Sequence, residues 1–79
     1  MRPSKLARSP LSKQLVDDVI DSYVMWREEA SAVRAAYDGW MLADRDRSTI
    51  AFAAYVAALD REERAAHEYQ RFVQMADAQ

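Results

Sequence analysis

The chain has no cysteine, one glycine and two prolines among its 79 residues. Without cysteine, disulfide bonds and metal sites built from thiolates are excluded. Pro3 and Pro10 both lie in the first ten residues and the glycine is Gly39, so almost nothing after Leu11 breaks a helix. Strand signals are also missing, because no run alternates regularly between apolar and polar residues. The sequence therefore predicts an all-α protein.

Long hydrophobic runs are absent as well. The longest uninterrupted apolar run extends from Ile50 to Leu59, far short of the ~20 residues that span a bilayer. No apolar segment follows the basic N-terminal residues as it would in a signal peptide. We therefore expect a cytoplasmic protein with no membrane contact. A chain this short buries little surface alone, and oligomerisation is one way to compensate.

Charge is unevenly distributed around the formal net charge of −2. Residues 1–14 carry four basic side chains and no acidic one, which predicts a basic N-terminal arm over residues 1–10 on an acidic body. A nucleic-acid-binding domain presents Lys and Arg along one face, so we do not expect nucleic acid as a partner. The arm is either a solvated terminus or a contact for an acidic partner, a membrane surface or, as a lesser alternative, nucleic acid.

Two long stretches repeat apolar residues every three or four positions, the spacing of helices that pack along one line of contact, here called the seam. In the first stretch the predicted seam residues are Val16, Val19, Tyr23, Trp26, Ala30, Val33, Tyr37 and Trp40. In the second they are Phe52, Tyr55, Leu59, Glu62, Ala66, Tyr69, Val73 and Ala76, with Glu62 as the one polar exception. The pattern predicts a single domain over residues 11–79, with helices at about 11–42 and 48–76.

The cap signals leave alternatives at both helix starts. Ser9 followed by Pro10 suits the start of the first helix, and Ser12 is a second candidate. Asp46 or Ser48 would cap the second helix after a turn at about 43–48. Gly39 could end the first helix early, but we favour continuation to about residue 42 because apolar residues extend past it.

The two predicted seams mirror each other about position 46, which predicts a long antiparallel two-helix hairpin. This register brings five pairs level across the hairpin: Trp40 with Phe52, Tyr37 with Tyr55, Val33 with Leu59, Trp26 with Ala66 and Tyr23 with Tyr69. Two helices cannot cover all of their own apolar surface, and exposed apolar stripes attract partners. We therefore expect two hairpins to form a homodimeric four-helix bundle.

Small residues on the second helix would let another helix approach closely, and aromatic residues would add contact area. The predicted interface residues are Ala51, Ala54, Ala58, Ala65, Trp26, Trp40, Phe52 and Tyr55. Further large apolar residues lie outside the predicted seams, among them Ile20, Met41 and Val56. A protein partner other than a second copy would suit the same apolar surface.

Five consecutive charged residues, 60–64, cover every side of a helix, so one carboxylate must turn toward the seam. The main hypothesis is a polar layer that sets register through ion pairs, made of Arg27, Glu29, Glu62, Glu63 and Arg64. The alternative is a carboxylate and histidine metal site like that of di-iron helical bundles, made of Glu29, Glu62, Glu63 and His67. The Glu-x-x-His spacing of those bundles is absent, and four nearby arginines would repel a cation.

Catalytic chemistry has little support in this sequence. With one histidine, no cysteine and few hydroxyl groups, we expect no triad of nucleophile, base and orienting residue, and no cofactor. The predicted function is a small non-enzymatic assembly or adaptor module that acts through protein–protein contacts. The metal-binding helical bundle remains the alternative.

Overall fold

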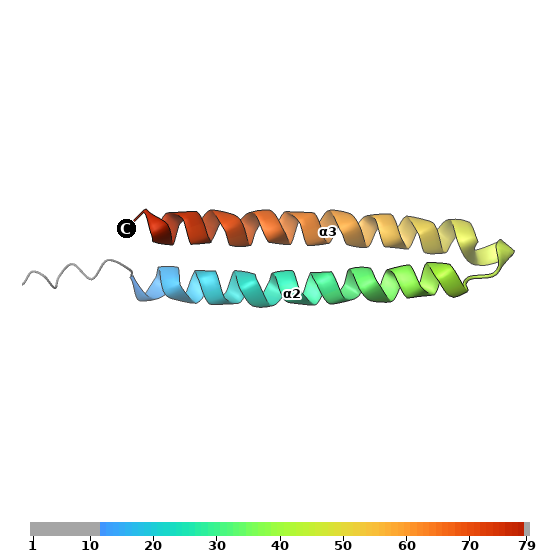
Figure 1. The fold of residues 1–79 in the computed structure, drawn as a ribbon, viewed down its shortest axis with the longest axis horizontal. Helices are drawn as coiled ribbons and strands as arrows, with labels where there is room; N and C mark the ends of the chain where they lie inside the picture. The colour runs from blue at the N-terminus through green and yellow to red at the C-terminus, as the bar shows by residue number, and fades with distance from the viewer. Residues whose placement is uncertain (1–11, 79) are drawn as a thin grey trace, which may run out of the picture.

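The computed structural model describes residues 12–78, which form two helices that lie side by side and run antiparallel (Figure 1). Helix α2 spans Lys13–Leu42 and helix α3 spans Arg45–Asp77, and no strand occurs in this part of the chain. At a rise of 1.5 Å per residue the helices are about 45 and 50 Å long. The described chain therefore begins and ends at the same end of the hairpin, here called the open end, and turns at the other. The predicted basic arm and the Ser9–Pro10 cap lie outside the described residues.

Helix α2 starts at a serine cap. The Ser12 hydroxyl accepts a hydrogen bond from the Leu15 backbone N–H at 3.0 Å, which satisfies one of the free donors of the first turn. The helix therefore begins at Lys13. It passes through Gly39 and ends at Leu42.

The connection between the helices is shorter than the sequence predicted. Asp44 caps α3, because its carboxylate accepts a hydrogen bond from the Arg47 backbone N–H at 3.0 Å. Asp46 then lies in the first turn, where a negative charge is favourable near the positive end of the helix dipole. The predicted turn at about 43–48 and the predicted caps Asp46 and Ser48 were therefore wrong. Only two residues, 43 and 44, separate the helices.

Aromatic contacts across the hairpin confirm three of the five predicted pairs. The ring centroids of Trp40 and Phe52 lie 4.8 Å apart, and the other two confirmed pairs are Tyr37 with Tyr55 at 5.6 Å and Tyr23 with Tyr69 at 5.5 Å. Because the pairs lie near both ends of the seam, α2 and α3 keep one register along their length.

The aromatic residues form two similar clusters. In each, a Tyr-x-x-Trp segment of α2 contacts a tyrosine of α3, and the indole ring stacks on that tyrosine ring. Trp26 lies 5.5 Å from Tyr69 with an interplanar angle of 14°, and Trp40 lies 5.5 Å from Tyr55 with an angle of 21°. The clusters are fourteen residues apart on both helices, a spacing of two heptads. The same packing is thus used twice along the hairpin.

The seam lies on slightly different residues from those predicted. In the described chain only Leu15, Ser22 and Ala58 are buried, at 9%, 8% and 1% exposure. Each immediately precedes a predicted seam residue that is itself exposed: Leu15 before Val16, Ser22 before Tyr23 and Ala58 before Leu59. Five of the sixteen predicted seam residues are exposed and therefore lie at the edge of the α2–α3 contact.

Small side chains explain this shift. Ser22 and Ala58 occupy little space, so placing them inward lets the two helix backbones approach closely. The Ser22 hydroxyl donates to the Val19 carbonyl at 3.0 Å, which satisfies its polar group inside the contact. Tyrosine keeps its ring against the neighbouring helix when placed at the edge, while its hydroxyl remains near water.

Candidate functional site

Of the thirteen large apolar side chains that are exposed in residues 12–78, eight lie on one side of the hairpin. We call this stripe the exposed apolar face, and its members, each at least 37% exposed, are Val16, Ile20, Tyr23, Tyr37, Met41, Phe52, Val56 and Leu59. On each helix the members are separated by steps of three, four or multiples of seven residues, so they share one side. An exposed apolar stripe of this kind on a small protein is a candidate interaction site.

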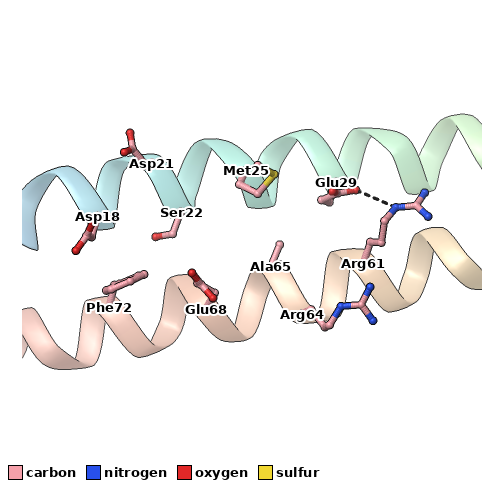
Figure 2. Close-up of a pocket in the computed structure, with 10 residues that line it drawn as sticks. All are labelled: Asp18, Asp21, Ser22, Met25, Glu29, Arg61, Arg64, Ala65, Glu68 and Phe72. Atoms are coloured by element: carbon pink, nitrogen blue, oxygen red, sulfur yellow. Dashed lines mark hydrogen bonds and ion pairs between the residues drawn. The ribbon is translucent and has the colours of Figure 1, made fainter.

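The opposite side of the hairpin is hollowed by two open grooves. Figure 2 shows the first, a groove of about 600 Å³ near the open end, to which both helices contribute side chains. Its lining residues are Asp18, Asp21, Ser22, Met25, Glu29, Arg61, Arg64, Ala65, Glu68 and Phe72. The second, of about 620 Å³ near the turn, is lined by Ala36, Gly39, Leu42, Ala43, Arg47, Ile50, Ala51 and Ala54. We call this side the groove face; it is charged toward the open end and mostly apolar toward the turn.

The structure divides the predicted interface residues among three environments. Ala58 is buried against α2 inside the hairpin, and the half-buried Trp26, Trp40 and Tyr55 pack in the seam. Ala51, Ala54 and Ala65 line the groove face, whereas Phe52 belongs to the exposed apolar face. Ala58 is therefore a contact within one hairpin, and its side chain is not available to a second molecule.

A polar contact crosses the middle of the seam. The Trp26 indole N–H donates to the Glu62 carboxylate at 2.8 Å, and Glu62 is half-buried. This contact explains why a carboxylate is tolerated at a seam position, since a charged group removed from water needs a strong hydrogen-bond donor. The sequence predicted that Glu62 or Glu63 would turn inward, but not that a tryptophan would hold it.

One member of the predicted polar layer, Glu29, forms an ion pair that joins the two helices. The Arg61 guanidinium Nε donates to the Glu29 carboxylate at 3.4 Å (Figure 2). The pair lies at the surface, on the edge of the groove face, so it contributes at most about 1 kcal/mol. The ion pair therefore helps to fix the α2–α3 register more than it stabilises the hairpin.

The remaining charged residues of the layer lie outside the seam. Glu63 and His67 approach each other at 3.9 Å on the surface of α3, with side chains 71% and 73% exposed. Arg27 and Arg64 are exposed, and no ion pair to either occurs within residues 12–78. Between the two helices the predicted polar layer therefore consists of the Trp26–Glu62 hydrogen bond and the Arg61–Glu29 ion pair. Its other charged residues are exposed to solvent.

The proposed metal ligands do not converge. Glu62 faces Trp26, Glu29 faces Arg61, and the Glu63–His67 pair points to solvent. Over the part of the chain that the structure describes, no group of three or more His, Cys, Asp or Glu side chains is arranged to hold a metal ion. No geometric observation favours the metal-binding alternative.

Substituting Trp26 by phenylalanine is expected to destabilise the hairpin by about 1–3 kcal/mol, because Glu62 loses its donor while remaining half-buried. The aromatic contact with Tyr69 would largely persist. Thermal unfolding followed by circular dichroism at neutral pH measures the effect.

The matched control is Trp40→Phe. Trp40 has the same role in the second aromatic cluster, yet within residues 12–78 its indole N–H donates no hydrogen bond to another side chain. Its substitution removes a similar ring area without leaving a carboxylate unpartnered, so the loss should be smaller. Equal losses for the two variants would show that the Trp26–Glu62 bond contributes nothing to stability.

Neither described helix carries an apolar stretch long enough to cross a bilayer. The functional candidates are thus the two sides of the hairpin: an exposed apolar face that sequence analysis had partly assigned to the seam, and a groove face that carries three of the predicted interface alanines. Comparison with protein-family models, with curated proteins and with solved structures finds no match to this chain.

Proposed function

We propose that the protein is a small assembly or adaptor module that acts through protein–protein contacts and not by catalysis. In its simplest form it is a homodimer, in which two hairpins pack face to face as a four-helix bundle. The observation that carries this proposal is the exposed apolar face, whose eight large side chains remain at least 37% exposed in the single hairpin.

Energetics support an interaction role for this face. Fully burying one Val, Leu, Ile, Phe or Met side chain contributes about 1.5–3 kcal/mol. In the described chain only two apolar residues, Leu15 and Ala58, are buried, so the hairpin alone gains little from this term. Contact with a partner would bury most of the exposed apolar face at once. The same reasoning explains why small domains without disulfides depend on oligomerisation.

Native mass spectrometry and light scattering over a concentration series test the proposal. The expected result is a species of twice the 9.1 kDa chain mass at micromolar concentration. A monomer at every concentration would contradict the homodimer. An added mass of one or two metal ions per dimer would instead restore the metal-binding alternative, with Glu62, Glu63 and His67 as the first residues to substitute.

A further inference from the structure

We propose that the second copy docks on the exposed apolar face in one orientation, with the two-fold axis parallel to the long axis of the hairpins. Both turns then lie at the same end of the dimer, and α2 of each chain packs against α3 of the other. This inference rests on the proposed homodimer and adds the direction of assembly. Charge placement on the face carries the argument.

Two basic side chains of α2, Arg27 and Arg34, and one acidic side chain of α3, Glu63, interrupt the exposed apolar face near the middle of the hairpin. Arg27 follows Ile20 by seven residues and Glu63 follows Val56 by seven residues, so each lies in line with an apolar member of the face. Trp26 and Glu62, the residues immediately before them, are joined across the seam by a 2.8 Å hydrogen bond. Because the helices run antiparallel, the register of the aromatic pairs sets Arg27 level with residue 65. Glu63 is two residues further along α3 toward the turn, about 3 Å at 1.5 Å per residue, a distance that two long side chains can bridge.

Two hairpins stacked face to face about a two-fold axis have two arrangements. With the axis along the hairpin, α2 lies over α3 of the second copy. Arg27 of each chain then lies near Glu63 of the other chain, so the dimer contains two such contacts. With the axis across the hairpin, α2 lies over α2 and α3 over α3. That arrangement gathers Arg27 and Arg34 of both chains and sets the two Glu63 side chains opposite each other. Opposite charges attract and like charges repel when water is partly excluded, so the first arrangement is favoured.

The single hairpin leaves both charges without a strong partner. Arg27 is exposed and has no ion pair within the described chain, and Glu63 reaches only the exposed His67 at 3.9 Å. Charged residues inside an apolar interface select the arrangement in which they are paired, because any other alignment leaves them unpaired or beside a like charge. A second copy in the proposed orientation supplies both partners through the same contact.

Single-cysteine spin labelling tests the orientation in the full-length protein. The chain has no native cysteine, so Arg47→Cys near the turn and Gln74→Cys near the open end each carry one label per chain. Both positions are exposed and outside the exposed apolar face. Mass measurement and circular dichroism of the labelled samples establish that they are dimeric and helical before distances are measured by pulsed electron paramagnetic resonance.

The expected result is a short distance for both variants, roughly 25 Å, set by helix-to-helix spacings of about 8–10 Å and the label arms. The opposite orientation would separate the labels at position 47 by about 45 Å or more, from the 1.5 Å rise per residue. That result would overturn the proposed orientation while leaving the homodimer intact. A monomeric mass would overturn both the orientation and the homodimer.

Charge reversal provides a second readout. Arg27→Glu and Glu63→Arg, made in separate chains, should each weaken self-association at least tenfold, because each homodimer then contains like charges at the contact. Mixing the two variants should yield mainly heterodimer by native mass spectrometry, since both contacts between chains become complementary again. Residues 27 and 63 of the same chain carry the same charges in the homodimer and in the heterodimer. Their interaction within one hairpin therefore cannot cause a preference for the heterodimer. If Arg27→Glu alone strengthened self-association, or if the mixture formed no excess of heterodimer, the proposal would be wrong.

Discussion

Ile20→Arg is expected to convert the proposed homodimer into a monomer that remains helical. Ile20 is 54% exposed in the hairpin, so an arginine there has access to water and should cost the single chain little. In the dimer, two isoleucine side chains leave the contact and two charges enter it. Losing about 1.5–3 kcal/mol per isoleucine already weakens association at least about a hundredfold. Sedimentation equilibrium at micromolar concentration measures the change, and circular dichroism reports the helicity.

Met25→Arg is the matched control. Met25 lies on the same helix and is 50% exposed, but it lines the groove face and not the exposed apolar face. The substitution introduces the same charge at a similar exposure, so effects on solubility or on the single helix should be equal. We expect Met25→Arg to remain dimeric. If Met25→Arg dissociated the protein and Ile20→Arg did not, the groove face would be the interface.

Ala58→Leu is expected to destabilise the hairpin by about 1–3 kcal/mol, the usual cost of inserting extra methylene groups into a packed contact. Ala58 is 1% exposed and lies where α3 meets α2, so a larger side chain must push the helices apart. In a hairpin with few buried residues, this loss is a large part of the total stability. Urea unfolding followed by circular dichroism measures it.

Ala57→Leu provides the comparison, because Ala57 is the preceding residue on the same helix and is exposed. Alanine and leucine have similar helix propensities, so any large difference between the two variants must come from packing against α2. Ala57→Leu should change stability by less than about 0.5 kcal/mol, as is usual for surface substitutions. Stabilisation by Ala58→Leu would mean that the helices are not in close contact at this position.

Secondary structure and register were largely predictable because they depend on local and periodic features. The scarcity of glycine and proline after Leu11 excludes helix breaks, and the three-and-four spacing of apolar residues defines one side of each helix. Mirror symmetry of the aromatic positions then predicted that Tyr23 would contact Tyr69 and that Tyr37 would contact Tyr55, as the structure confirms. The repeated Tyr-x-x-Trp segments were also readable from the sequence, but their meaning as a duplicated packing unit was missed.

The candidate site was less predictable, because it depends on helix rotation. Periodicity identifies a broad apolar side but does not decide which of two neighbouring rows turns fully inward. A small rotation of α3 about its own axis is enough to turn Ala58 toward α2 and to leave Leu59 at the edge of the contact. Alanine at the inward position was therefore mistaken for part of an external interface. The cap at Asp44 was missed because three candidate caps follow one another within five residues, and only the backbone path selects one.

Three properties could be read from the amino-acid sequence alone: the chain is helical, its two helices pair in a defined register, and it has more apolar surface than two helices can cover. These properties follow from propensity, spacing and composition, which act locally or add along the chain. The tertiary structure decided which apolar residues remain exposed and which carboxylate enters the seam. Those outcomes depend on how closely two helix backbones can approach, and that distance is set jointly by small side chains such as Ser22 and Ala58 on both helices.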